Sequence, residues 1–436
     1  NCKFMSITHG KEGTEIFWCE KDGHIISQNI SYKIENVVDS IGAGDAFLAG
    51  TIFTYIQNGE NFNVYQKQLT LNTKPLVANI LSNFGARYES KGIQFDFGND
   101  KCQYCGSNII TKKTKLQTNL DTLLARVDDA YKTGFEEKLK EFLCKSKSFL
   151  LIGAGASYTT ANYLKDILEK TGKFAQTITP CDICDTNLQI FDTVVLCSYW
   201  GTTPEILDCM RKALSAGKKV GIITGKDISQ FSNIPENVAI LSYATNKFIR
   251  EKGFIAVASI IIPAFFITKI YFKSENIDKF LVDCISNFKK FEIKAKIFKR
   301  KYHVVDIFYN GKTETIAKDM ESKMVESSFG RVTLHNKKNF SHGRYTTFEN
   351  NRPNLVIYYD YDEKNKYETL LMNYLKKFKS ENIIVINPKT KHEHLKEFEL
   401  LLFNQFFINL LDRKVDYEIS VPAHSSYSVE LYNFGR

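Results

Sequence analysis

Residues 148–172 read SFLLIGAGASYTTANYLKDILEKTG, with a short apolar run, a glycine-containing loop and an amphipathic segment in succession. This order is typical of a buried strand, a turn and a helix. Residues 191–225, FDTVVLCSYWGTTPEILDCMRKALSAGKKVGIITG, repeat the order and add a further strand. Short buried strands that alternate with helices predict an α/β fold in which helices cover both faces of a parallel sheet.

A second unit of the same kind follows the first along the chain. Strand-like apolar runs at residues 302–311, 354–362 and 382–389 alternate with helical patterns, and the last helical pattern is centred near Leu400. Two α/β units of similar size indicate an internal duplication, although few residues are identical between them. We expect both units to have three layers, with a parallel sheet between helices.

The N-terminal quarter of the chain has a different pattern. Apolar alternation around Gly10 and Gly13 predicts a strand, a turn and a strand, and VVDSIGAGDAFLAG at residues 37–50 predicts a strand, a glycine-rich loop and a helix. A polar stretch and two amphipathic helical patterns follow, which we interpret as a linker with docking helices. The predicted segments are therefore residues 1–97, 98–145, 146–290 and 291–436.

Composition limits the classes of function. The 436 residues are 43% hydrophobic, enough for two or three cores, and the chain starts with Asn1 rather than Met, so we expect an upstream portion. The net charge of +9 suits phosphate-bearing ligands, but no basic stripe interleaved with aromatic residues indicates nucleic-acid binding. The most apolar run, residues 254–267, is shorter than the roughly 20 residues of a membrane span and predicts a core helix.

The ten cysteines indicate a reducing, cytoplasmic environment, because several lie in apolar runs, as Cys197 does. Two CxxC pairs occur, Cys102 with Cys105 and Cys181 with Cys184. Four thiolates can form a zinc site, but these pairs lie far apart and in different predicted segments. We therefore favour structural thiols and predict no metal site there.

The glycine-rich loop of the N-terminal segment has the residues of a phosphate-binding turn. Backbone amides of Gly42, Ala43 and Gly44 can converge on an anion at the start of the following helix. Asp45 follows at a place where a carboxylate can take a proton from an attacking hydroxyl during phosphoryl transfer. A plain turn is the alternative interpretation of such a loop taken alone.

The string DSIGAGDAF at residues 39–47 resembles the Asp-Thr-x-Gly-Ala-Gly-Asp-x-Phe signature of ribokinase (PfkB) family carbohydrate kinases, and SITHGKEG at residues 6–13 resembles the family's nucleotide-side strand. The resemblance implies ATP and Mg²⁺ as cosubstrates. It also implies a catalytic base at Asp45, an anion hole at Gly42, Ala43 and Gly44, and nucleotide contacts at Thr8 and Gly10. The family's sugar-binding portion would precede these residues, so we expect no sugar phosphorylation by this chain alone.

Hydroxyl residues follow two strands of the first α/β unit. Ser157 follows the first strand, and Ser198, Thr202 and Thr203 follow the strand TVVLC. Open parallel sheets bind ligands at the carboxyl ends of their strands, where hydroxyls and helix N-terminal amides can hold a dianion. Each residue taken alone is better explained as a helix cap.

Together these segments resemble the sugar isomerase (SIS) family, including the isomerase half of glucosamine-6-phosphate synthase and the amino-sugar deglycases. GASYTTA resembles the family's Gly-Thr-Ser-Tyr loop, and CSYWGTTPEI its Ser-x-Ser-Gly-x-Thr loop. AVAS at residues 256–259 resembles the Val-Ala-Ser segment that lines the sugar. Trp200 replaces the second serine of the motif, so we expect a remodelled phosphate site. The resemblance implies phosphate and sugar contacts at Ser157, Ser198, Thr202, Thr203, Ala258 and Ser259.

The second unit carries the residues expected to act on the sugar. Asp319, Lys323 and Glu326 are spaced by four and three, so they share one helix face, and a surface row of ion pairs is the simpler interpretation of that spacing. The helix resembles the synthase's Glu-x-x-x-Lys-x-x-Glu helix, and NFSHGR resembles its Lys-His-Gly loop. The resemblance implies that Glu326 moves a proton between C1 and C2, that His342 assists ring opening and that Lys323 holds the substrate or polarises its carbonyl.

We therefore expect a double SIS module that isomerises, deglycates or deaminates a phosphorylated sugar or amino sugar, needs no cofactor, and is joined to part of a kinase. Glu326 with His342 favours this enzyme. The alternative is a non-catalytic phosphosugar sensor that regulates the kinase, which Trp200 favours. A third possibility is a subunit whose missing kinase half comes from another chain. By family resemblance we expect a homodimer.

Overall fold

The computed structural model describes three short N-terminal strands and most of the chain from Thr114 to Ser420. The chain divides into two compact units, residues 1–112 and 113–436, which are described separately. Within the second unit the described part excludes residues 233, 246, 248–250, 252, 254, 274–275, 290–302, 351–352, 362–364, 379–381 and 413–418.

In the N-terminal unit the described residues form one antiparallel sheet. Its strands pair in chain order, with Phe4 opposite Trp18 and Thr14 opposite Ile30. The first two strands lie where the alternation of apolar residues predicted a strand, a turn and a strand. The bounds are β1 (Phe4–Thr8), β2 (Thr14–Cys19) and β3 (Ile25–Ile30).

The first sheet of the larger unit has five parallel strands in the order β5-β4-β6-β7-β8. This confirms the parallel α/β fold expected from the strand and helix alternation. All residues of the central strand β6 are buried, as a sheet covered on both faces requires. The bounds are β4 (Ser148–Ile152), β5 (Phe174–Ile178), β6 (Thr193–Cys197), β7 (Lys219–Thr224) and β8 (Val238–Ser242).

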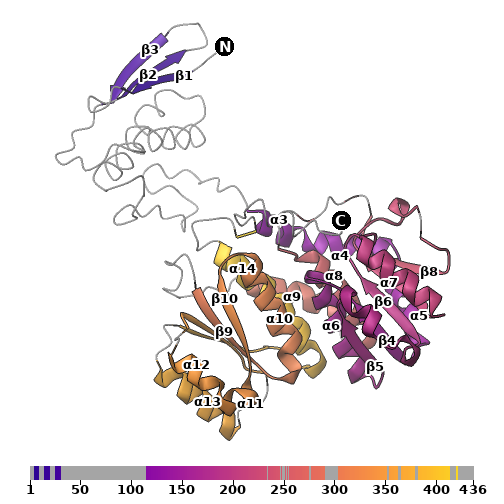
Figure 1. Ribbon diagram of the computed structural model, residues 1–436. Helices are drawn as coiled ribbons and strands as arrows, with labels where there is room; N and C mark the ends of the chain where they lie inside the picture. Colours follow the sequence, from indigo (N-terminus) through magenta and orange to yellow (C-terminus); the bar gives the residue numbers. More distant parts are fainter. Residues whose placement is uncertain are drawn as a thin grey trace. The chain divides into compact units, whose positions relative to one another are not determined.

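Helices cover both faces of this sheet (Figure 1). On β4, Phe149 and Leu151 pack with α6 and α8, while Leu150 and Ile152 pack with α7 on the opposite face. This alternation follows from the two-residue period of a strand. The helices are α6 (Ala156–Lys170), α7 (Pro204–Ser215) and α8 (Ala258–Tyr271).

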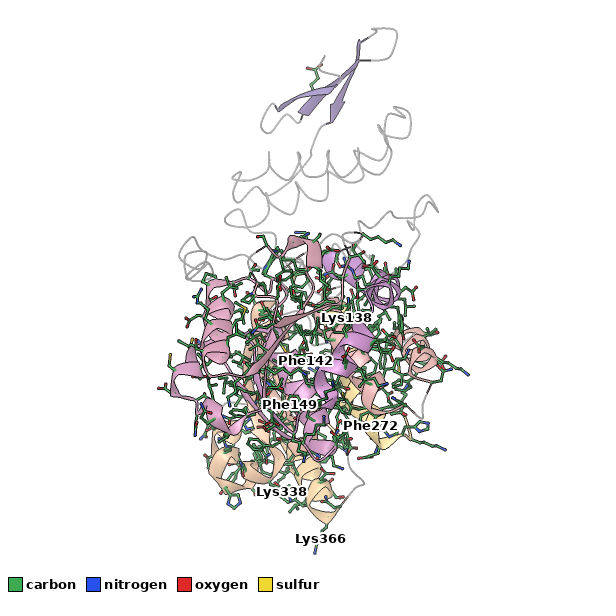
Figure 2. All side chains as sticks on the ribbon, turned by 90° about the vertical axis from the view of Figure 1, so that its right-hand side faces the viewer. Lys138, Phe142, Phe149, Phe272, Lys338 and Lys366 are labelled. Atoms are coloured by element: carbon green, nitrogen blue, oxygen red, sulfur yellow. The ribbon has the colours of Figure 1, made fainter. Side chains whose placement is uncertain are left out.

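The segment interpreted as a linker with docking helices contains three helices that are part of the core. Leu123, Phe135 and Leu139 are fully buried, and Phe142 lies so close to β7 that a side chain at Gly221 would meet its ring at 2.5 Å. In Figure 2, Phe142 and Phe149 lie in the interior, whereas Lys338 and Lys366 lie at the periphery. The helices are α3 (Lys115–Asp121), α4 (Leu123–Lys132) and α5 (Phe135–Cys144).

The second sheet has four parallel strands in the order β10-β9-β11-β12. β10 was not anticipated from the sequence, because it is an edge strand in which six of seven residues are at least partly exposed. The strands are β9 (His303–Tyr309), β10 (Gly330–Asn336), β11 (Leu355–Tyr359) and β12 (Ile383–Ile386). The helices are α10 (Glu314–Glu326), α11 (Lys337–Asn339), α12 (Tyr345–Asn350), α13 (Lys366–Lys377) and α14 (Lys396–Asp412).

One hydrophobic core joins the two sheets. Helices α6, α8, α10 and α14, together with α9 (Ile277–Lys289), contribute buried side chains to it, and Phe265 of α8 meets Phe398 of α14 with ring centroids 6.2 Å apart. The apolar run that predicted a core helix is α8. Among the described residues, no helix has the length and apolarity needed to cross a membrane.

Candidate active site

A cavity of about 470 Å³ opens at the carboxyl ends of β4, β5 and β6. β4 lies between β5 and β6. The chain runs from β4 to β5 on one side of it and then crosses to β6 on the other side, so the strand order reverses at β4. Such a point is where open parallel sheets bind their ligands. Five of the residues proposed from the sequence line this one cavity: Ser157, Ser198, Thr203, Ser259 and Glu326.

Ser157 is placed by a tight connection between β4 and α6. The helix begins at Ala156 after Gly155, whose φ of 54° is in the left-handed region that favours glycine. A side chain at Gly153 would lie 2.6 Å from the backbone oxygen of Ser157, so this position also requires glycine. The loop therefore brings the first turn of α6 to the cavity.

Ser198 and Thr203 are placed by the loop between β6 and α7. Ser198 Oγ accepts a hydrogen bond from the backbone N–H of Gly201 at 3.1 Å, and Thr203 is the residue before Pro204, the first of α7. Gly201 has a φ of 65°, and a side chain there would meet the ring of Phe231 at 2.8 Å. The glycine of the motif is thus needed for the shape of the loop.

Trp200 lies at the edge of the cavity and does not fill it. Its side chain is 36% exposed and packs edge-on against Tyr199, with ring centroids 5.6 Å apart. Both aromatic residues line the cavity. The residue that replaces the second serine therefore changes the chemistry of the wall from hydroxyl to aromatic, and space for a ligand remains.

Glu326 is the last residue of α10, the helix between β9 and β10 of the second sheet. Its side chain lines the cavity. Ser322 Oγ donates a hydrogen bond to its Oε1 at 2.8 Å. Burial raises the pKa of the Glu326 carboxyl, and Lys323 and Ser322 oppose that rise only in part. A carboxylate whose pKa is raised is a stronger base than an exposed one, which suits it to take up a proton and give it back.

Lys323 and Asp319 are buried, so the interpretation of this helix face as a surface row of ion pairs is wrong. Lys323 Nζ lies 3.1 Å from the Asp319 carboxylate and donates to the backbone oxygen of Ala256 at 3.0 Å. Ala256 lines the cavity, but Lys323 is not among the lining residues. The ammonium group therefore holds the wall of the cavity from behind.

Three other proposed residues lie outside the lining of the large cavity. His342 is exposed in the turn Phe340–Arg344, and the fold of one chain does not bring it to Glu326. Thr202 Oγ1 donates to the backbone oxygen of Trp200 at 3.3 Å. Ala258 lines a small neighbouring chamber of about 20 Å³.

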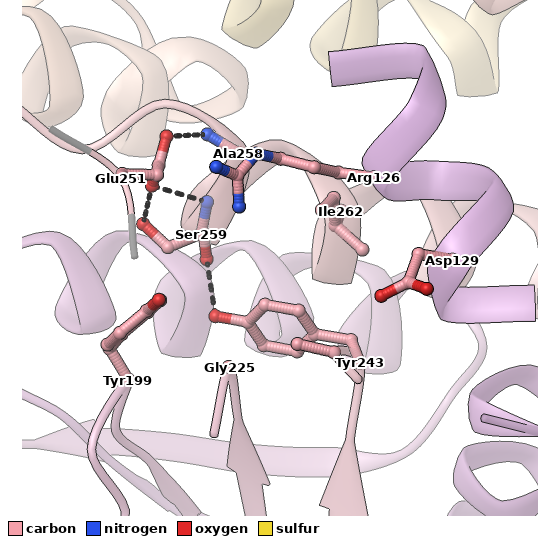
Figure 3. Close-up of a pocket in the computed structure, with 10 residues that line it drawn as sticks. Arg126, Asp129, Tyr199, Gly225, Tyr243, Glu251, Ala258, Ser259 and Ile262 are labelled. Carbon is pink, nitrogen blue, oxygen red and sulfur yellow. Dashed lines mark hydrogen bonds between the residues drawn. The ribbon is translucent and has the colours of Figure 1, made fainter. Parts of the chain in front are cut away.

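Glu251 lines both the chamber and the cavity, and Figure 3 shows it in the wall of the chamber. Its carboxylate accepts hydrogen bonds from the N–H groups of Val257 (3.1 Å), Ala258 (2.6 Å) and Ser259 (3.0 Å), and from Ser259 Oγ (2.7 Å). It thereby caps α8 and fixes the orientation of the Ser259 hydroxyl. No motif marks Glu251, because it lies six to eight residues before its partners in an irregular segment.

The residues proposed for the kinase-like segment cannot be placed in the same way. Gly10, Asp45 and the loop residues Gly42, Ala43 and Gly44 lie outside the described residues. Thr8 is the last residue of β1.

The cysteines divide into two groups. Cys197 and Cys209 are buried, as expected for structural thiols, and burial raises the pKa of the first to about 12 and of the second to about 11. Cys181 and Cys184 are exposed, which corrects their interpretation as structural thiols, while Cys102 and Cys105 lie outside the described residues. Within the described part of the chain, no group of three or more His, Cys, Asp or Glu residues could hold a metal.

Comparison with known families agrees with this geometry. The family model described as the SIS domain matches residues 142–259, which contain β4 to β8 and most of the cavity wall. Residues 142–259 are therefore similar to an SIS domain. No curated protein matches the sequence significantly.

Solved structures extend the likeness beyond the SIS domain match. Tagatose-6-phosphate ketose/aldose isomerase from Escherichia coli is 14% identical, has a TM-score of 0.54, and is matched over 72% of this chain and 96% of its own. Glucosamine-6-phosphate deaminase from Thermotoga maritima is 15% identical, has a TM-score of 0.50, and is matched over 70% of this chain and 98% of its own. At this level of identity the likeness establishes the fold.

Proposed function

We propose that the cavity binds a phosphorylated sugar or amino sugar and that Glu326 moves a proton between two neighbouring carbons of its open-chain form. The observation that carries this proposal is that Glu326 lines the same cavity as Ser157, Ser198 and Thr203. Glu326 comes from a helix of the second sheet, and the three hydroxyl residues come from the segments that follow β4 and β6 of the first sheet. Isomerisation between aldose and ketose phosphates, or the related removal of an amine, is the reaction class that fits.

The phosphate would lie among the hydroxyls of Ser157, Ser198 and Thr203. Ser157 and Thr203 stand at the N-terminal ends of α6 and α7, where backbone N–H groups and the helix dipoles favour an anion, and Ser198 directly follows β6. Neutral donors can hold a dianion there without a buried counter-charge. Trp200, beside them, offers an aromatic face to the sugar carbons.

The proton transfer would use the carboxylate form of Glu326. It takes the proton from the carbon next to the carbonyl group, which leaves an enediolate, and it returns the proton to the neighbouring carbon. Ketose/aldose isomerase and deaminase are the names of the two structural relatives. Interconversion of an aldose and a ketose requires a proton transfer of this type. Lys323 would act indirectly, by holding the wall at Ala256.

His342 stays a proposal that requires a second copy of the chain. Because this side chain is exposed and lies outside the cavity lining of its own chain, it can assist ring opening only if a homodimer presents it to the partner's cavity. A mixture of Glu326→Gln and His342→Ala chains tests this, since a mixed dimer would regain one complete site. Activity no greater than the sum of the two variants would remove His342 from the reaction.

For the N-terminal unit, we retain the proposal that residues 1–97 are the C-terminal part of a ribokinase-like domain, with Asp45 as base and ATP with Mg²⁺ as cosubstrates. It rests on the DSIGAGDAF and SITHGKEG strings. Of the residues that would hold these groups, all except Thr8 lie outside the described part, so we derive no step through them.

A sensor that binds a phosphosugar without turning it over is the second candidate. It is favoured by Trp200, which puts an indole where the family motif has a phosphate-binding hydroxyl. Both candidates predict binding in the same cavity, and they differ only in the need for Glu326 as a base.

Thermal-shift measurement with a panel of hexose, pentose and amino-sugar phosphates tests binding in this cavity. A ligand should stabilise the natural chain but not a Ser198→Ala/Thr203→Ala chain, since stabilisation follows affinity for the folded state. Thr369→Ala, in which an exposed hydroxyl on α13 is lost, is the matched control and should respond as the natural chain does. Equal stabilisation of the double variant would place the ligand elsewhere.

A further inference from the structure

Cys181 and Cys184 lie three residues apart in one short 3₁₀ helix, Pro180–Asp185. Side chains three residues apart in such a helix eclipse one another, and a rise of about 2.0 Å per residue separates their Cα atoms by about 6 Å. Disulfide-bonded cysteines have Cα atoms roughly 4.4–6.8 Å apart. A regular 3₁₀ backbone therefore has a spacing that suits a disulfide between these two positions.

The helix that carries the pair is held in place at both ends of its first turn. Thr179 Oγ1 donates to Asp182 Oδ2 at 2.7 Å, and the same oxygen accepts from the Thr179 N–H at 3.2 Å. Cys209 of α7 donates from Sγ to the backbone oxygen of Pro180 at 3.6 Å. These contacts fix the backbone on which both thiols stand.

A positive charge lies beside one of the two thiols. Lys212 Nζ, on α7, is 2.9 Å from Cys184 Sγ and 2.6 Å from the Asp208 carboxylate. Hydrogen bonds to Asp208 and Cys184 raise the pKa of Lys212, so it stays an ammonium group at neutral pH. A neighbouring ammonium favours the thiolate of a cysteine, which is its reactive form.

Two buried cysteines cannot compete in this chemistry: Cys209, which contacts Pro180, and Cys197, which lines the cavity. Both are buried, and their raised pKa values keep them as thiols. Cys181 and Cys184 are exposed and open to a reagent in solution. Reaction is therefore expected at Cys181 and Cys184 and not at the buried pair.

Cys181 is also part of the cavity wall, together with Thr179 and Pro180. We propose that Cys181 and Cys184 are a dithiol–disulfide site at the wall of the cavity, which reacts with low-molecular-weight disulfides. This chemistry does not depend on the reaction proposed for Glu326. Because Cys181 lines the cavity, formation of the disulfide would change the chemistry of the cavity wall at that residue.

The reaction has two balanced steps. Cys184 thiolate attacks one sulfur of the small disulfide, forms a mixed disulfide and releases one small thiolate, which takes a proton from water. Cys181, after losing its proton to solvent, attacks Cys184 Sγ and releases the second small thiolate. The two protein thiols are oxidised to one disulfide, and the small disulfide is reduced to two thiols. In the product, Cys181 Sγ and Cys184 Sγ form a disulfide bond. Cys184 is then no longer a thiolate partner of Lys212.

Treatment of the reduced, full-length chain with oxidised glutathione tests the proposal. After free thiols are trapped with N-ethylmaleimide, peptide mass spectrometry should find Cys181 joined to Cys184, and dithiothreitol should reverse the bond. Cys181→Ser should stop at glutathione on Cys184. Glutathione that stays on either cysteine of the natural chain, or no reaction at the pair, would overturn the proposal.

The rate of alkylation by iodoacetamide tests the role of Lys212. In a Cys181→Ser background, Lys212→Met should slow alkylation of Cys184 about tenfold, because the sulfur loses the ammonium group that lies 2.9 Å from it. Lys218→Met is the matched control, because Lys218 contacts Gln189 and not the thiol. Equal rates in the Lys212 and control variants, with unchanged circular dichroism, would show that the ammonium does not activate Cys184.

Discussion

At the scale of single residues, Glu326 carries most of the functional proposal. It is a largely buried carboxyl group at the end of a helix, and burial raises its pKa more than Lys323 and Ser322 lower it. Such an arrangement destabilises the charged form and makes the carboxylate a stronger base than that of an exposed glutamate.

Activity should therefore depend on pH through this carboxyl group. Because proton removal needs the carboxylate, kcat/KM should rise with pH and reach half its maximum above the ordinary glutamate value of about 4.3. Glu326→Gln should lower kcat by about 100-fold or more while the phosphosugar still stabilises the chain. A rate that falls as pH rises through this range would contradict the role of Glu326 as the base.

The same residue should affect stability with a definite sign. The pKa of Glu326 is higher in the folded chain than in the unfolded one, so its contribution is favourable at low pH and is lost as pH rises through the folded pKa. Glu326→Gln should therefore melt at a higher temperature than the natural chain at pH 8, and the difference should vanish below about pH 4. Melting curves over this pH range check the prediction, and a lower melting temperature of the variant at pH 8 would count against it.

At the scale of elements, the buried pair of Asp319 and Lys323 joins α10 to the cavity wall. Asn404 and Gln405 of α14 also donate to Asp319, at 3.0 and 3.2 Å. Lys323→Met would leave the carboxylate buried without its counter-charge, so we expect a loss of about 3–5 kcal/mol of unfolding free energy. Lys318→Met, which breaks a partly exposed pair with Glu314, should change it by less than about 1 kcal/mol. Urea unfolding of both variants checks this, and similar losses would contradict it.

The loop between β6 and α7 allows a second comparison at this scale. Gly201 and Gly217 both have φ in the left-handed region, but only at Gly201 would a side chain meet a neighbour, the Phe231 ring. Alanine at either position should cost about 1 kcal/mol from backbone strain. Gly201→Ala should cost about 1–3 kcal/mol more from the clash and should also weaken binding of the phosphosugar. Equal losses would mean that the loop moves away freely.

At the scale of the whole molecule, residues 113–436 form one body in which two sheets share a core. Helices α3 to α5, which precede most of the SIS domain match, are part of that body. Phe135→Ala should therefore lower the unfolding free energy of the body by about 3–5 kcal/mol, as truncation of a fully buried aromatic residue does elsewhere. A change below about 1 kcal/mol would instead indicate helices that only dock on its surface.

The sequence alone predicted the parts of this body that have strong local patterns. The buried strands and amphipathic helices were clear, and the loop motifs pointed to Ser157, Ser198 and Thr203, which line one cavity. The edge strand β10 was missed because its exposed residues carry little apolar pattern. Glu251 was missed because its capping role arises from tertiary contacts, and the position of His342 depends on how a loop folds over the second sheet.

The most direct test of the central claim is hydrogen exchange between a bound phosphosugar and D₂O, followed by NMR. For a ligand that stabilises the chain, the natural protein should introduce deuterium at the carbon next to the carbonyl group. The Glu326→Gln chain should bind the same ligand without exchange. Exchange that persists in this variant would contradict Glu326 as the base, and a bound ligand that never exchanges in the natural chain would leave the sensor as the function of the cavity.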